Sequence, residues 1–555
     1  MVYFFINLFI SSIFSIISGY QLTKLSFIKK ELDPTEAGLF GFIFLGILSL
    51  FANFFLALDP NINSIIISIF ILLFIFQIKN NFSRGKEILI SSLKISLIAL
   101  IFLVFSNNFD PDSFLYHLPY SNLINDYKIL PGAGLIHFRF GTISIMQYIN
   151  ALFNNHIFGA NGITIPTSLV FSFFFLFLLN KITEILKNKS LFSLYNFFIL
   201  CSFIFLCLRM NRYSDYGNDH IVTIFFLYFL SIFIKKFDAF DINDKKYLTL
   251  LACFIFTLKV FYFVPLILCL YLWIPKINFK IINFSNVLCL FFLLLWFVKN
   301  ILISGCIIYP ISFTCINKLP WYNLSNKNFV SAKQISLSGE AWAKNWNTYN
   351  TKQKSLGIEM DKFESQEEYI KNFFWLNEWM MDHGKFMFKK LFPFLTFIII
   401  LYLMNRKKTT NVSIKKNNKL FFLLLFINSI ALSLWFLKFP IMRYGLAYIF
   451  TQIFLITFIF FKDRFSQNIK FIFVLSLFIL ISKNLIRISE NYNTSLYPEI
   501  EKQNKYLYIN KNKLKIYYTK DLCGYKNSPC TSYKESINNI EVKKFYNYKY
   551  ISLIN

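Results

Sequence analysis

Long apolar runs recur along the whole chain and are separated by short polar segments. Most are roughly 17 to 25 residues long, the length that crosses the hydrocarbon core of a bilayer as a helix. The runs lie near residues 1–20, 37–57, 60–78, 88–107, 163–181, 191–208, 220–234, 248–274, 286–303, 387–404, 420–437, 446–461 and 471–487. This pattern predicts an all-α transmembrane bundle of about 12–14 spans over residues 1–487, followed by a small tail over residues 488–555.

Lysine and arginine gather in short connections between the runs, and basic residues near membrane helices stay in the cytoplasm. These connections lie near residues 24–30, 79–86, 181–189, 235–246, 406–416 and 462–470. The run 248–274 has two cytoplasmic flanks and holds Lys259 and Pro265 in its middle. We therefore expect two short helices there, or a broken re-entrant hairpin. The extracytoplasmic face then receives loops 108–162 and 304–385, the tail and all five histidines.

The chain carries 57 Lys+Arg against 29 Asp+Glu, a formal net charge of +28. A nucleic-acid binder concentrates such charge on one polar face with interleaved aromatic side chains, whereas here most of the excess is lysine in the short connections. We interpret the charge as a topology signal and expect no nucleic-acid partner. The sequence also lacks Walker A, GxGxxG and GxSxG motifs. It therefore gives no support for a protein driven by nucleotide hydrolysis.

The segment NFDPDSFLYHLPY directly follows the fourth apolar run and contains several polar residues. Its two carboxylates, Asp110 and Asp112, are candidates for a general base or a cation site. His117 lies within two turns of Asp112, where it can add a ligand or relay a proton. Asp112 can instead cap the start of a helix, and the sequence leaves both roles open.

The same loop continues as KILPGAGLIHFRFG, in which His137 and Arg139 follow a Pro-Gly turn. A guanidinium suits a phosphate because it can bind two oxygens at once. Arg139 and His137 are therefore candidates for contact with a lipid phosphate, and a solvated loop arginine is the alternative.

A second polar segment, RMNRYSDYGNDH, interrupts the apolar pattern between two runs. Charge at the membrane surface is expensive and usually functional. Asp215, Asp219 and His220 are candidates for completing the pocket or holding a divalent metal ion, and Arg212 is a candidate for binding the lipid phosphate. The alternative is an Arg–Asp pair that only ties two helices together.

A third segment, WFLKFPIMRYG, forms a short turn between two runs and presents Arg443 and Tyr444. Basic groups held between helices near lipid headgroups suit a lipid phosphate. Arg443, Tyr444 and Lys259 are therefore further candidates for binding the phosphate. An ordinary belt of interfacial anchors is the alternative.

Tryptophans in the long loop recur four residues apart, at Trp342 and Trp346 and again at Trp375 and Trp379. This spacing predicts that each pair shares one face of a helix, and we expect these helices to lie on the membrane. Among nine cysteines, five lie within the runs, and two pairs lie on the oxidising face. We expect disulfides at Cys523–Cys530 and, less securely, at Cys306–Cys315.

Several motifs, taken in order, resemble those of poorly characterised bacterial membrane proteins associated with the GT-C superfamily of glycosyltransferases. They are DPDSFLYHLPY…ILPGAGLIHFRFG, RYSDYGNDH, KNILISGCIIYP, EAWAKNW…WLNEWM, WFLKFPIMRYG and LCGYKNSPCT, between about residues 107 and 535. The resemblance implies a GT-C-like fold, a lipid-phosphate-linked sugar donor and a catalytic acid in the first large extracytoplasmic loop, where Asp110 and Asp112 lie. Here that loop follows the fourth run rather than the first, and no large soluble domain follows.

The leading hypothesis is a glycosyltransferase in the bacterial inner membrane, with its active face extracytoplasmic. It would move a sugar from a polyprenyl-phosphate donor to a cell-envelope glycan or lipid acceptor. Asp112 or Asp110 would be the base, with His117 beside them, and a divalent metal ion is an open possibility. The alternatives are a lipid-linked glycan polymerase or ligase, a flippase, and a non-catalytic membrane assembly protein.

Overall fold

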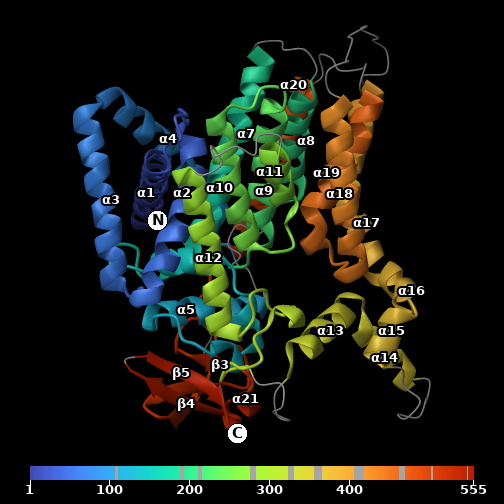
Figure 1. Ribbon diagram of the computed structural model, residues 1–555. Helices are drawn as coiled ribbons and strands as arrows, with labels where there is room; N and C mark the ends of the chain where they lie inside the picture. The colour runs from blue at the N-terminus through green and yellow to red at the C-terminus, as the bar shows by residue number, and fades with distance from the viewer. Residues whose placement is uncertain are drawn as a thin grey trace.

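The computed structural model describes residues 1–106, 111–187, 193–209, 216–274, 283–322, 330–355, 365–404, 418–461, 469–501, 504–546 and 548–554. It is an all-α helical bundle with a small strand-containing tail at one end (Figure 1). Every predicted apolar run contains a helix. Within the described ranges, nine helical segments are long and apolar enough to cross a membrane, which makes this a multi-pass membrane protein.

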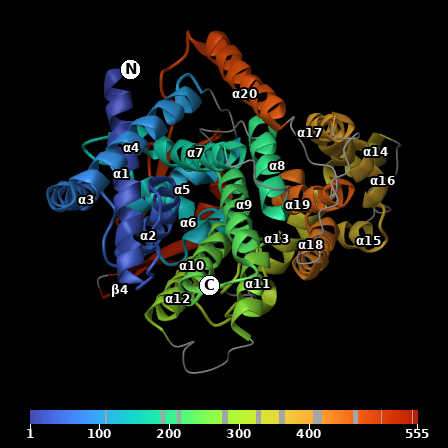
Figure 2. The ribbon, with the colours of Figure 1, turned by 90° about the horizontal axis from the view of Figure 1, so that it is seen from above.

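The helices of the bundle form three groups when seen from above (Figure 2). The first is α1 (Val2–Leu25), α2 (Pro34–Phe55), α3 (Pro60–Asn80) and α4 (Phe82–Leu103). The central group is α7 (Ile165–Lys187), α8 (Leu194–Arg209), α9 (Asp219–Lys236), α10 (Ile242–Leu258), α11 (Val264–Trp273) and α12 (Phe284–Ser304). The third is α17 (Lys385–Met404), α18 (Asn418–Lys438) and α19 (Met442–Phe461), while α20 (Ile469–Asn491) packs against α8.

Helices α1 and α2 approach each other closely because glycine occupies their contact face. A Cβ atom added to Gly19 would lie 1.9 Å from the Ala37 carbonyl oxygen, and one added to Gly41 would lie 1.9 Å from the Ser15 carbonyl oxygen. Small residues allow such close backbone packing between membrane helices.

The predicted break in the run 248–274 is present. Helix α10 ends at Leu258, α11 begins at Val264, and the two pack side by side. The intervening turn is fixed against α19, because the Tyr448 hydroxyl donates to the Phe261 carbonyl at 2.8 Å. The Tyr262 ring also stacks on Tyr448, with centroids 5.1 Å apart. Lys259 is therefore held at a defined position beside α19.

An arm of four short helices extends from the end of the bundle that carries the tail (Figure 1). They are α13 (Ala332–Ala343), α14 (Trp346–Ser355), α15 (Gln366–Lys371) and α16 (Trp375–Trp379). The expectation that Trp342 and Trp346 share a helical face is wrong, because α13 ends between them and Asn345 has a φ of +70°.

The second tryptophan pair, in α16, is packed inside the protein. Trp375 and Trp379 are buried against the α18–α19 turn. The Trp379 indole donates to the Pro440 carbonyl at 2.6 Å, and the Trp375 ring lies 5.4 Å from Phe436. The arm is therefore docked on the turn that leads to Arg443.

The tail folds into two small sheets under the bundle. Strands β1 (Leu507–Lys511), β2 (Leu514–Tyr518) and β3 (Cys530–Thr531) form one sheet, and β4 (Ile540–Phe545) and β5 (Tyr548–Leu553) form an antiparallel hairpin. Disulfides join Cys523 to Cys530 and Cys306 to Cys315. The other five cysteines are free and buried.

The tail is bound to the loop that follows α4. The backbone N–H of Gly524 donates to the Phe114 carbonyl at 2.9 Å, and the N–H of Ile551 donates to the Pro131 carbonyl at 2.9 Å. Tyr525 reaches deeper, because its hydroxyl donates to Asn125 and accepts from Asn154 at 2.7 Å. The tail thus forms part of the structure around the first polar segment.

Candidate functional site

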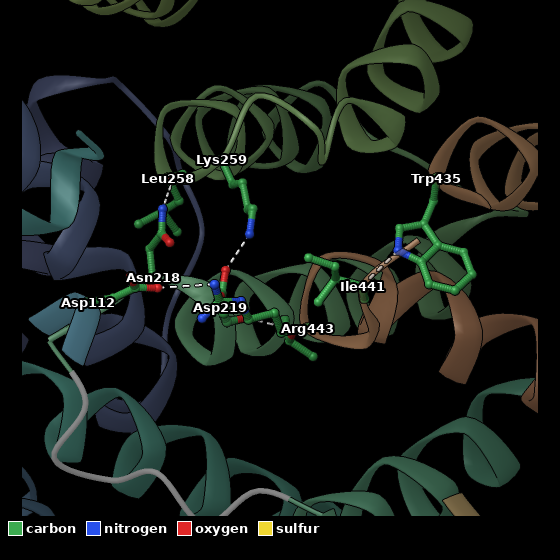
Figure 3. Close-up of polar contacts among 9 residues, drawn as sticks. Asp112, Asn218, Asp219, Leu258, Lys259, Trp435, Ile441 and Arg443 are labelled. Carbon is green, nitrogen blue, oxygen red and sulfur yellow. Dashed lines mark hydrogen bonds and ion pairs between the residues drawn. The ribbon is translucent and has the colours of Figure 1, made fainter. Parts of the chain in front are cut away.

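Four charged side chains converge from four separate segments of the chain (Figure 3). Asp112 lies in the helical turn that follows α4, and Asp219 is the first residue of α9. Lys259 directly follows α10, and Arg443 is the second residue of α19. We call these four residues the charge cluster.

Arg443 bridges the two carboxylates of the charge cluster. Its Nη2 atom lies 3.0 Å from Asp112 Oδ2, and its Nε atom lies 3.5 Å from Asp219 Oδ2. Lys259 Nζ pairs with the other oxygen of Asp219 and lies 3.6 Å from the centroid of the Tyr444 ring. The cluster therefore contains two cations and two anions.

The four side chains are mostly buried, with 16–27% of each exposed. Removing charges from water is costly, and breaking one partner of such a pair leaves the other uncompensated. The remaining exposure still lets a solute reach the cluster. This combination is typical of a site that binds a charged group as well as of a structural ion-pair network.

Local structure fixes the relative positions of Asp219 and Lys259. The Asn218 side chain, at the start of α9, donates to the carbonyl of Leu258, the last residue of α10 (Figure 3). Asp219 is also placed favourably at a helix N-terminus, where the helix dipole stabilises negative charge. The adjacent residues Asn218 and Asp219 thus supply the hydrogen bond that joins α9 to α10 and the carboxylate of the cluster.

Arg443 is positioned by the turn before α19. The Trp435 indole donates to the Ile441 carbonyl at 2.9 Å (Figure 3). Gly445 leaves space for this ring, because a Cβ added there would lie 2.6 Å from it. Trp435 and Gly445 therefore fix the position of the Arg443 guanidinium.

The backbone of Asp112 argues against the capping role. An N-cap residue usually has an extended backbone, whereas Asp112 has helical angles, with φ −59° and ψ −35°. The carboxylate of Asp112 is directed to Arg443 instead. Asp110 lies outside the described residues.

His117 is held in one tautomer by Gln147. The Ser144 backbone N–H donates to Gln147 Oε1 at 3.2 Å, which identifies the other side-chain atom as the amide nitrogen. That nitrogen lies 2.9 Å from the Tyr216 carbonyl and 3.0 Å from His117 Nδ1. Since the amide only donates, Nδ1 must accept, and the proton of the neutral ring is on Nε2.

His117 is also kept neutral. Burial lowers the pKa of its imidazole to about 4, although Asp112 and Asp219 act in the opposite direction. His117 therefore faces the charge cluster as a neutral N–H donor rather than as a cation or a base.

His137 and Arg139 have different roles. His137 Nδ1 accepts from the Arg139 backbone N–H at 3.2 Å and so caps a short helical turn. Burial, reinforced by Arg139, lowers the pKa of His137 to about 3. The Arg139 guanidinium lies 5.1 Å from the Tyr116 ring, which contacts His117. Arg139 is thus a third cation close to the cluster.

The candidate residues of the second polar segment, for phosphate and for metal, are only partly described. Arg212 and Asp215 lie outside the described residues. His220 follows Asp219 in α9, with its ring 6.3 Å from Phe171. Within the described part of the chain, no group of three or more His, Cys, Asp or Glu side chains is arranged to hold a metal ion.

Sequence reasoning missed three residues around the site. Gln147 and Asn218 carry no motif that indicates a distant partner, although Ser144 and Gln147 do match a capping box. Trp342 was expected on the membrane surface, yet its ring lies 5.9 Å from the Arg443 guanidinium. These contacts depend on tertiary packing.

A family model described as a domain of unknown function, DUF8201, matches residues 1–450. The chain belongs to the DUF8201 family. The matched DUF8201 segment contains all four residues of the charge cluster, and the tail follows it. Comparison with curated proteins and with solved structures gave no match. The DUF8201 description assigns no activity, so a functional argument rests on the geometry of the site.

Proposed function

We propose that this protein is a glycosyltransferase that moves a sugar from a polyprenyl-phosphate donor to an acceptor at the outer face of the bacterial inner membrane. The supporting observation is that Arg443 joins Asp112 and Asp219 at one end of an apolar helical bundle. A transferase of this kind needs a base for the acceptor hydroxyl and cations for the departing lipid phosphate.

The two carboxylates of the charge cluster have different contacts, and we propose different roles for them. Asp219 contacts both Lys259 and Arg443, so it holds these cations in place. Asp112 contacts Arg443 through one oxygen atom. Two carboxylates in different environments can take different parts in one reaction. We assign the base to Asp112 and the positioning of the cations to Asp219.

The cations are suited to the donor's phosphate. Arg443 has five N–H donors, and the two ion pairs engage only two of its three nitrogens. A phosphate can therefore bind the guanidinium without displacing both carboxylates. Lys259 lies on the Tyr444 ring on the other side of Asp219 and supplies a second positive charge.

In the proposed reaction, the acceptor hydroxyl oxygen attacks the anomeric carbon of the donor sugar. The bond between that carbon and the phosphate oxygen breaks, and the hydroxyl proton moves to Asp112. Polyprenyl phosphate leaves with its negative charge beside Arg443 and Lys259. Electrostatic stabilisation of such developing charge is commonly the largest contribution to catalysis.

The test compares two ion-paired aspartates. Membrane vesicles that contain the protein are supplied with a radiolabelled polyprenyl-phosphate hexose, and label transferred to glycan or lipid is counted. Asp112→Asn keeps the shape of the side chain but removes the base, so transfer should fall by about 10² or more. Asp244→Asn is the control, since Asp244 is also an ion-paired aspartate, 3.1 Å from Lys236, and lies near the opposite end of α10 from Lys259.

Transfer at the wild-type rate by Asp112→Asn, at equal protein level, would exclude Asp112 as the base. Movement of label across the membrane without transfer would favour a flippase. Loss of thermal stability in Asp112→Asn, with no transfer by the wild type, would favour a structural ion-pair network in an assembly protein.

A further inference from the structure

A cavity of about 780 Å³ opens beside the charge cluster. Its walls come from the turn 134–139, the end of α12, helix α13 and the tail around α21 (Lys534–Asn538). Helices α13 and α21 lie at the same end of the molecule as the lower end of α12 in Figure 1. The cavity thus lies among the elements of this end rather than between membrane-spanning helices.

Five aromatic rings line this cavity, among aliphatic and polar side chains. They belong to Phe138, Tyr309, Trp321, Trp342 and Tyr533. Trp342 and Tyr533 are 41% and 43% exposed, so their rings are available for stacking. Aromatic rings with a polar group offer an apolar face together with a hydrogen-bonding edge.

Polar groups occur between the rings. They are hydroxyls and an amide from Ser338, Ser532, Ser536 and Asn539, with charges from Arg139, Lys534 and Glu535. A cavity with apolar walls and a few placed polar groups is typical of a small-molecule site, and 300–1,000 Å³ is the usual size. Sugar rings have apolar C–H faces and hydroxyl edges, so this lining matches a saccharide better than an acyl chain.

Two of the lining residues also border the charge cluster. The Trp342 ring lies 5.9 Å from the Arg443 guanidinium, and Arg139 lies over Tyr116, the neighbour of His117. A saccharide seated on Trp342 therefore has one end close to Asp112.

We infer that this cavity is the acceptor site and that the acceptor is a short saccharide or the end of a glycan chain. The inference rests on the proposed function and makes it more specific, because it selects a glycan rather than a lipid as acceptor. It also gives the tail a direct part in recognition through Tyr533.

The test measures binding without any transfer reaction. The full chain is reconstituted in lipid nanodiscs free of glycoside detergents. Maltotriose, triacetylchitotriose and trigalacturonic acid are then titrated by calorimetry. At least one probe should bind, and Trp342→Ala and Tyr533→Ala should each weaken that binding about tenfold, as expected for loss of a stacked ring. Tyr508→Ala is the matched control, because Tyr508 is an exposed tail tyrosine outside the cavity.

Absence of heat for all three probes up to about 10 mM would overturn the inference, and so would binding that neither variant weakens. The two proposals fail separately. Cavity-dependent binding with normal transfer by Asp112→Asn would remove the assigned catalytic base and keep the saccharide site. Loss of transfer in Asp112→Asn, without saccharide binding in the cavity, would keep Asp112 as the catalytic base and remove the saccharide site.

Discussion

The backbone of Asp112 distinguishes this aspartate from the aspartates that cap other helices. Asp33-Pro34 and Asp59-Pro60 start α2 and α3, and in each the aspartate accepts backbone N–H bonds as the N-cap. Asp112 differs from these caps, because its backbone is helical and its carboxylate pairs with Arg443. The sequence could indicate the residue types but not the partner, which is 331 positions away.

Changing Gln147 should change the protonation of His117. Gln147→Glu replaces the amide donor at Nδ1 with a carboxylate that accepts a proton there. A neighbouring carboxylate favours the charged imidazole, so the pKa of His117 should rise from about 4. Titration of ¹⁵N-histidine signals by NMR checks this.

The matched control is Gln334→Glu, since Gln334 occupies the same capping-box position at the start of α13. A His117 signal that stays neutral from pH 7 to pH 5 in Gln147→Glu would contradict the assigned tautomer. Transfer activity is not needed for this measurement.

Acid should destabilise the folded protein through its buried histidines. The pKa of His137 is about 3 when folded, against an ordinary value of 6.5. Between these values the unfolded chain binds more protons, so stability falls as pH drops below 6.5. At pH 5.5 the loss is about 1 kcal/mol for this residue.

His137→Asn keeps an acceptor for the Arg139 N–H but cannot titrate. Its thermal midpoint should therefore fall less than that of the wild type between pH 7 and pH 5.5. His156→Asn, which changes an exposed histidine, should behave like the wild type. Equal slopes for all three proteins would show that His137 does not set the acid sensitivity.

At the scale of helices, apolar run length predicted the elements well, because every span has to cover the same hydrocarbon thickness. The interruption at Lys259 could also be predicted from the sequence, since a charge and a proline disfavour one continuous membrane helix. The helices of the arm were not predicted correctly, because the end of α13 depends on the positive φ of Asn345. The strands of the tail are short and were not predicted.

Gly445 sets the spacing between α18 and α19. Alanine usually stabilises a helix interior by about 1 kcal/mol relative to glycine, but at 445 its Cβ would lie 2.6 Å from the Trp435 ring. We expect Gly445→Ala to lower the thermal midpoint and to reduce transfer, because Arg443 shifts with the ring.

Gly339→Ala is the control for thermal stability, since its Cβ would be 3.7 Å from Phe439 and open space surrounds it. The control should raise the midpoint slightly. A higher midpoint for Gly445→Ala as well would mean that Trp435 can move without cost.

At the scale of the whole molecule, the four groups of the charge cluster, the arm and the tail meet at one end of the bundle. The basic connections predicted this end to be extracytoplasmic. Reporter fusions after Lys187 should therefore score cytoplasmic, and fusions at Gly339 should score extracytoplasmic. The reverse pattern would place the cluster on the cytoplasmic side and remove an outer-face reaction.

The contact between the tail and the first polar segment imposes an order on the making of this protein. Tyr525 bonds to Asn125 across 400 residues, and Gly524 bonds to Phe114, two positions after Asp112. The ribosome must therefore synthesise residues 524 and 525, and the tail must reach this end of the bundle, before the turn that carries Asp112 gains its final support. Helices inserted early would keep an incompletely supported charge cluster until that segment docks, so docking of the tail would act as a late step of maturation.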